Sequence, residues 1–89
     1  MTRLLVKGVE AALGANTGTA NAFSNARLLR VVNTTANAYL VTLVAAVGGS
    51  TLGSFTLAGG ESVELEKEPL NGIFAANNGV KASAIGYSN

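Results

Sequence analysis

The 89-residue chain contains no Cys, His, Trp or Asp and only one Pro. Without His, Cys and Asp it cannot form a Ser-His-Asp triad, a Cys-His pair or a histidine general acid–base. Zinc and the softer metals prefer His and Cys ligands, and calcium loops rely on Asp at alternate positions, so these sites are excluded too. We therefore predict no catalytic, cofactor-binding or metal-binding residues, and we expect the protein not to be an enzyme.

Charged side chains are also scarce. They make up 12% of the residues, against about 25% in ordinary soluble domains. The formal net charge of +1 gives no strong field toward nucleic acid or an anionic membrane, and we expect neither as a partner. A lone subunit normally depends on a charge-rich surface for solubility, and the cores of subunit interfaces are depleted of charge. The composition therefore predicts a homo-oligomer that hides part of its surface.

Long apolar runs are absent as well. The longest, residues 38–47, has ten residues and includes Thr42, which is too short to span a bilayer. Residues 1–7 lack the apolar core of a signal peptide. We expect one soluble domain over residues 1–89 that is not exported through a cleaved signal.

Strand-like patterns dominate what is present. Runs rich in Val, Tyr, Thr and Phe alternate with turn sequences containing Gly, Asn and Pro. The predicted strands are residues 4–6, 27–33, 39–47, 51–57, 61–67, 73–76 and 80–87. In the fifth, Val63 and Leu65 alternate with Ser62, Glu64 and Glu66, which is typical of an antiparallel strand with one face in solvent. We predict an all-β fold, an antiparallel β-sandwich (Ig-like or jelly-roll-like) or a small barrel of about seven short strands.

Residues 8–25 fall outside this strand pattern, and they are rich in Ala, Gly, Asn and Thr. Two interpretations are equally compatible with this composition. The segment is either a flexible, loop-like N-terminal arm that reaches a neighbouring subunit or an ordinary long surface loop.

Two features resemble functional sites but have simpler interpretations. The glycine-containing stretch Gly48–Ser54 has no Lys after Gly53 and no helix to follow, so we predict a hairpin turn rather than a phosphate-binding loop. Glu64 and Glu66 lie two apart on one predicted strand, about 6.5 to 7 Å between backbone positions, a separation compatible with a glycosidase pair. We interpret them as a solvated face whose charges discourage edge-to-edge pairing.

Three stretches resemble small structural proteins of tailed bacteriophages, especially marine phages. They are LLRVVNTTANAYLVT (Leu28–Thr42), GSFTLAGGESV (Gly53–Val63) and VKASAIGY (Val80–Tyr87). The resemblance covers about residues 27–87 and is one of strands and turns. It implies a virion component, such as a capsid decoration or cement protein or a small neck or tail piece, and it brings no catalytic residues.

On this resemblance we expect a protein made in the host cytoplasm and located on the capsid surface of the virion. Its partners would be further copies of itself, with a trimer as the working expectation, and the major capsid protein or another virion protein. Apolar residues on faces that a seven-strand subunit cannot cover, such as Ile85 and Tyr87 opposite Val80, Ala82 and Ala84, would then lie at contacts. An alternative from a different class is a carbohydrate- or receptor-binding β-sandwich. Its candidate site residues are Asn71, Asn77, Asn78 and Tyr87.

Overall fold

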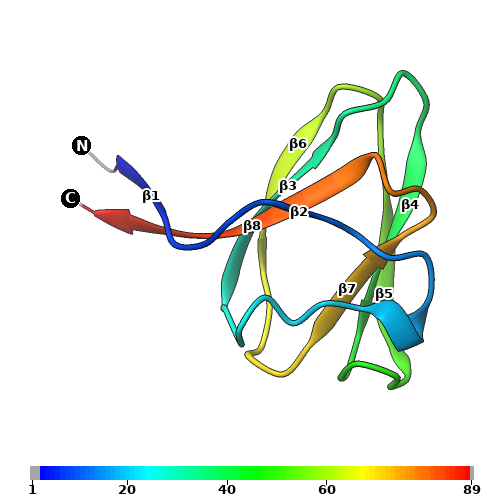
Figure 1. Ribbon diagram of the computed structural model, residues 1–89, viewed down its shortest axis with the longest axis horizontal. Coiled ribbons are helices and arrows are strands. Elements are labelled where there is room, and N and C mark those ends of the chain that lie inside the picture. Colours follow the sequence, from blue (N-terminus) through cyan, green and yellow to red (C-terminus); the bar gives the residue numbers. More distant parts are fainter. Residues whose placement is uncertain (1–2, 89) are drawn as a thin grey trace.

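The computed structural model describes residues 3–88, which form two antiparallel sheets (Figure 1). The elements are β1 (Arg3–Val6), β2 (Ala11–Ala12), the 3-10 helix η1 (Thr17–Thr19), β3 (Leu28–Asn33), β4 (Tyr39–Val44), β5 (Thr51–Leu57), β6 (Ser62–Glu66), β7 (Gly72–Ala75) and β8 (Val80–Ser88). Over this described range there is no α-helix. The predicted all-β class and antiparallel sandwich are confirmed.

The larger sheet has the strand order β1-β8-β3-β6, with β2 paired to β8 next to β1. The smaller sheet has the order β5-β4-β7. β4 lies between β5 and β7. It ends at Val44 rather than Val47 because the chain turns there: the Gly49 amide donates to the Ala46 carbonyl (2.7 Å), and Gly48 has a φ of 79°.

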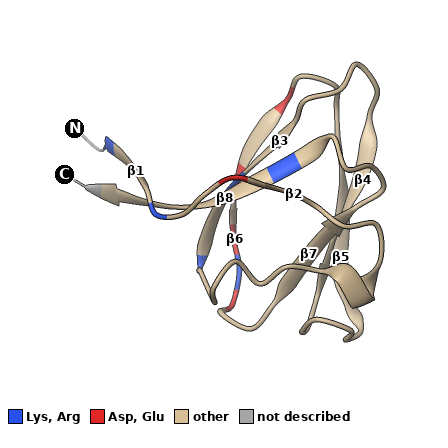
Figure 2. Cartoon of the chain, in the orientation of Figure 1, with Lys and Arg blue, Asp and Glu red and all other residues tan. Residues whose placement is uncertain are grey.

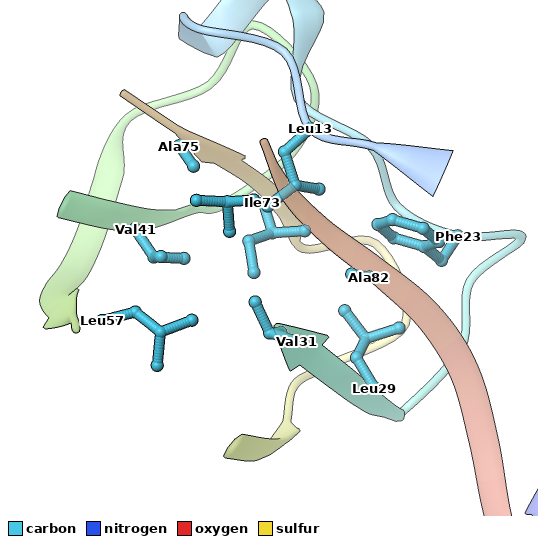
Figure 3. Packing of buried hydrophobic residues seen from close by; sticks show 10 residues of the cluster. Leu13, Phe23, Leu29, Val31, Val41, Leu57, Ile73, Ala75 and Ala82 are labelled. Atoms are coloured by element: carbon cyan, nitrogen blue, oxygen red, sulfur yellow. The ribbon is translucent and has the colours of Figure 1, made fainter. Parts of the chain in front are cut away.

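The core lies between the two sheets (Figure 3). The larger sheet contributes Leu29, Val31, Val80 and Ala82, and the smaller sheet contributes Val41, Leu57, Ile73 and Ala75, all fully buried. On β3 the pattern follows strand alternation, because Leu29, Val31 and Asn33 are buried while the residues between them are half-buried. A strand with one face in the core produces this period of two.

Residues 8–25 pass from one sheet to the other. Ala11 and Ala12 pair with Ala82 and Lys81 of β8 in the larger sheet. Further on, the Gly14 carbonyl accepts a hydrogen bond from Ala75 of β7 (2.9 Å), and Asn21 forms a β-bridge with Ile73 of β7. Leu13 and Phe23 of this segment join the core. The segment is thus a long connection that closes one side of the sandwich.

Candidate docking surface

A two-stranded ribbon leaves the body of the sandwich (Figure 1). It consists of β1 and the end of β8, paired from Arg3 opposite Ser88 to Val6 opposite Ile85. The pairing of β8 with β3 stops at Ala84, so beyond that residue the paired neighbour of β8 is β1. We name residues 3–7 and 85–88 the ribbon.

Apolar side chains of the ribbon are exposed. Val6 is 76% exposed, Leu4 45%, Tyr87 43% and Leu5 39%. Isolated two-stranded ribbons are marginally stable in water, and burying apolar surface is favourable by about 25 cal/mol per Å². A partner that covers these side chains would therefore stabilise the ribbon.

The two predicted contact residues, Ile85 and Tyr87, differ in their solvent exposure. Both were expected to be left uncovered by a single subunit and to lie at subunit contacts. Tyr87 is exposed, but Ile85 is only 5% exposed, so that expectation is wrong for Ile85. It lies where the ribbon joins the body, beside a hollow that Ala26, Arg27 and Leu28 also line, and its burial is therefore internal to the subunit.

The ribbon has an open backbone edge on β1. Successive residues of a strand direct their N–H and C=O groups to alternate sides. The Lys7 amide donates to the Ala84 carbonyl at 2.8 Å, so Lys7, Leu5 and Arg3 face β8. The backbone groups of Leu4 and Val6 consequently point to the opposite, unpaired side of β1.

The second open edge of the larger sheet is β6. The Glu61 carbonyl accepts from the Asn33 amide (2.9 Å), and the Lys67 amide donates to the Arg27 carbonyl (2.8 Å). These odd-numbered residues face β3, so Ser62, Glu64 and Glu66 direct their backbone groups away from the sheet.

The two open edges carry opposite charges (Figure 2). Four of the five carboxylates of the chain, Glu61, Glu64, Glu66 and Glu68, lie in or beside β6, and all four are exposed. The predicted alternation of β6 is confirmed, with Val63 and Leu65 half-buried between exposed residues. The ribbon carries Arg3 and Lys7 and no acidic residue. The ribbon is therefore basic and the β6 edge is mainly acidic, while Arg27 and Arg30 lie next to these carboxylates on the body of the sandwich.

The ribbon and the outer face of the larger sheet enclose an open hollow, lined by Leu4, Arg30, Ser62, Val63, Glu64 and Tyr87. Arg30 and Glu64 lie directly opposite each other on β3 and β6. Along the chain no aromatic residue lies beside Glu64, and Tyr87 is far from it in sequence. Only the return of β8 to the side of β3 brings the two together.

The amide candidates for a binding site lie elsewhere. Asn71 precedes β7, and with its amide oriented to suit its neighbours it donates to the Ala45 carbonyl (3.2 Å). Asn77 and Asn78 follow β7 at its other end, where Asn77 Oδ1 accepts from the Gly79 amide (2.7 Å). Tyr87 is on the ribbon. The structure therefore distributes the four predicted residues over three places and does not form one site from them.

Other polar groups serve the fold. Gly48 lies in the β4–β5 turn, as predicted, and its amide donates to the Thr17 carbonyl (2.7 Å) rather than facing an open loop. Arg27 Nη1 and Glu68 Oε2 form an exposed ion pair at 3.7 Å. Lys67 Nζ donates to the carbonyls of Glu68 (3.3 Å) and Pro69 (3.1 Å). Burial lowers the pKa of the Lys67 ammonium from its ordinary value of 10.5.

Within residues 3–88 no three His, Cys, Asp or Glu side chains gather where they could hold a metal ion. In the same range no helix is long and apolar enough to cross a membrane. This surface offers open strand edges, exposed apolar side chains, and one edge that is basic and another that is mainly acidic. Such an arrangement can bind another protein surface by strand pairing and apolar contact.

Comparisons with known proteins found no match for this chain. No family model matches the chain, no curated protein matches it, and no solved structure matches its fold.

Proposed function

We propose that this chain is a non-enzymatic structural protein of a tailed-phage particle, a decoration or cement protein that binds the head as a homo-oligomer. The observation that carries the proposal is the ribbon, which projects from the sandwich with Leu4, Leu5, Val6 and Tyr87 exposed. Exposed apolar side chains on an extension away from the core are typical of a surface that another protein covers.

Three further features support an assembly role. The low content of charged residues limits how much surface is well solvated. The open edge of β1 carries the exposed apolar side chains of Leu4 and Val6, and an exposed apolar strand edge invites pairing with another chain. The resemblance of residues 27–87 to phage structural proteins supplies the setting, the capsid surface of the virion. The expected partners are other copies, arranged as a trimer, and the major capsid protein.

The first test is the composition of the particle. Purified virions of the phage that encodes this chain should contain it in amounts comparable to the major capsid protein, as measured by quantitative mass spectrometry of capsid fractions. Recombinant chain added to heads that lack it should co-sediment with them. Virions without the chain, together with heads that do not retain added chain, would refute the proposal.

A second candidate is a carbohydrate-binding module, favoured by one observation. Tyr87, Arg30 and Glu64 line the same hollow, and an aromatic ring beside polar groups is a common way to bind a sugar face. Glycan-array screening of the wild type and of the Tyr87→Ala variant tests this candidate. Binding lost in the variant would favour this candidate, and no binding by the wild type would remove it.

A further inference from the structure

The two open edges of the larger sheet fit each other better than either fits itself. The ribbon presents Arg3 and Lys7 without an acidic residue, whereas β6 and its flanks present four carboxylates. Pairing two ribbons, or two β6 edges, would place like charges together, which costs free energy. Pairing a ribbon with a β6 edge would place opposite charges together. A symmetric contact is therefore disfavoured, and a head-to-tail contact is favoured.

The smaller sheet also has an open edge, at β5. Residues 51–57 contain no charged side chain, so charge gives the basic ribbon no preference for this edge. Of these two edges, β6 with its exposed carboxylates is the one that complements the ribbon.

The alternation of side chains also selects a direction. β1 has a basic face (Arg3, Leu5, Lys7) and an apolar face (Leu4, Val6), and β6 has an acidic face (Ser62, Glu64, Glu66) and an apolar face (Val63, Leu65). The backbone groups of Leu4 and Val6 and those of Glu64 and Glu66 point to their open edges, as described above. In an antiparallel pair, residues that exchange hydrogen bonds lie opposite each other and share a face. That arrangement would put Leu4 and Val6 beside the carboxylates.

Parallel addition matches the faces. A residue of β1 in register with Glu64 then faces away from β6, so it belongs to the set that contains Arg3 and Lys7. The basic face of β1 lies along the acidic face of β6, and Leu4 and Val6 lie along Val63 and Leu65. We propose that β1 of one copy adds in parallel to the β6 edge of a second copy, so that the chain assembles head to tail through its larger sheet.

This inference rests on the proposed function, because it names the partner for the ribbon of an assembling protein. Head-to-tail contacts close into a ring if the rotation between copies allows it, and otherwise extend as a filament. A three-membered ring would be the trimer expected for a capsid site of three-fold symmetry. The same contact covers the exposed side chains of Leu4 and Val6.

Charge reversal tests the contact. Two variants, Arg3→Glu/Lys7→Glu and Glu64→Lys/Glu66→Lys, each change one side of it, and a third variant combines all four changes. Mass is measured by light scattering over a concentration series at low salt, with circular dichroism as a check that each variant is folded. The dissociation constant of each double variant should be about tenfold or more above that of the wild type. The quadruple variant, which carries all four substitutions, should regain most of the affinity. A matched control compares Lys7→Glu, which should weaken assembly, with Lys81→Glu, which makes the same charge change on β8 outside the ribbon and should not.

The other outcomes are decisive as well. The head-to-tail contact would be overturned by folded double variants that assemble like the wild type, or by a folded quadruple variant that stays dissociated. A wild type that is monomeric at all concentrations yet binds phage heads would also overturn it. The proposed function would then stand, with a capsid protein as the partner that binds the ribbon. A wild type that assembles in this way but is absent from virions would support the contact and refute the phage role.

Discussion

The side-chain amide of Asn33 on β3 donates a hydrogen bond of 2.9 Å to the carbonyl oxygen of Leu57 on β5. It joins the larger sheet to the smaller one at the end of the sandwich where three turns meet. The same amide donates to the Asn37 carbonyl (2.7 Å), and Oδ1 accepts from the Thr35 amide (2.9 Å) and hydroxyl (2.7 Å). Asn33 is fully buried, and both its Nδ2 and its Oδ1 have hydrogen-bond partners. It fixes the β3–β4 turn and the distance between the sheets.

Asn33→Asp should destabilise the protein strongly. A carboxylate at this position would face the carbonyls of Leu57 and Asn37 without a hydrogen to donate. Breaking such a buried network costs about 2 to 4 kcal/mol. Urea unfolding measures the loss, with Asn78→Asp as the exposed control, for which a change within about 0.5 kcal/mol is expected. Equal effects at the two positions would contradict this role of Asn33.

The segment before β3 contains three successive non-glycine residues with positive φ: Phe23 (52°), Ser24 (56°) and Asn25 (62°). The left-handed region costs an L-residue about 1 to 2 kcal/mol, with Gly and, to a lesser extent, Asn tolerating it best. At position 24 the free energy of unfolding should therefore follow the order Gly, then Ser, then Val, over a span of about 2 kcal/mol. At Ser54, in the exposed part of β5, Val should be better than Gly because extended backbone favours β-branched residues. Thermal or urea unfolding of the four variants checks both orders, and the same order at both sites would contradict this account of the turn.

Leu13 tests how firmly residues 8–25 belong to the body. Its side chain is 1% exposed and lies in the core cluster. Leu13→Ala should cost about 2 to 4 kcal/mol, as for other buried leucines, whereas Leu70→Ala, at a residue 67% exposed, should cost much less. Equal, small losses in urea unfolding would mean that the segment detaches from the sandwich in solution, as a flexible arm would.

The buried Lys67 should make the stability of the fold depend on pH. Its side chain is 4% exposed, and burial lowers the pKa of its ammonium in the folded state below the 10.5 of an ordinary Lys. Between the lowered pKa and 10.5 the unfolded chain binds more protons than the folded chain, so stability rises with pH through this window and levels off above it. Lys67→Met should remove this rise. Urea midpoints measured from pH 8 to 11 in wild type and variant give the comparison. Parallel profiles would contradict a buried, desolvated ammonium.

Local patterns in the sequence were sufficient for most strands. Residues 51–57 were predicted with the observed bounds, and β6 follows the alternation of Val63 and Leu65 with the glutamates. These signals are local because apolar and polar residues alternate along a strand that has one face in solvent. β2, with only two residues, has no length over which such a pattern can develop.

The ribbon could not be predicted in the same way. Leu4 and Tyr87 are at opposite ends of the chain, and nothing in either segment specifies its partner. The hollow that joins Tyr87 to Arg30 and Glu64 depends on that pairing. The burial of Ile85 has the same origin, because it is set by where the ribbon leaves the body and not by strand alternation. The basic residues of segment 3–7 and the glutamates of segment 61–68 are visible along the chain, but that both segments are open sheet edges follows only from the strand pairing.

Amide hydrogen exchange at four backbone positions tests the central claim most directly. The N–H groups of Leu4 and Val6 on β1, and of Glu64 and Glu66 on β6, point to open edges within a single subunit. If copies assemble through these edges, all four amides should become protected together as the protein concentration rises, while Leu5 and Leu65, paired inside the subunit, remain protected throughout. Exchange of the four at the rate of unprotected amides, at every concentration and also on phage heads, would contradict the account.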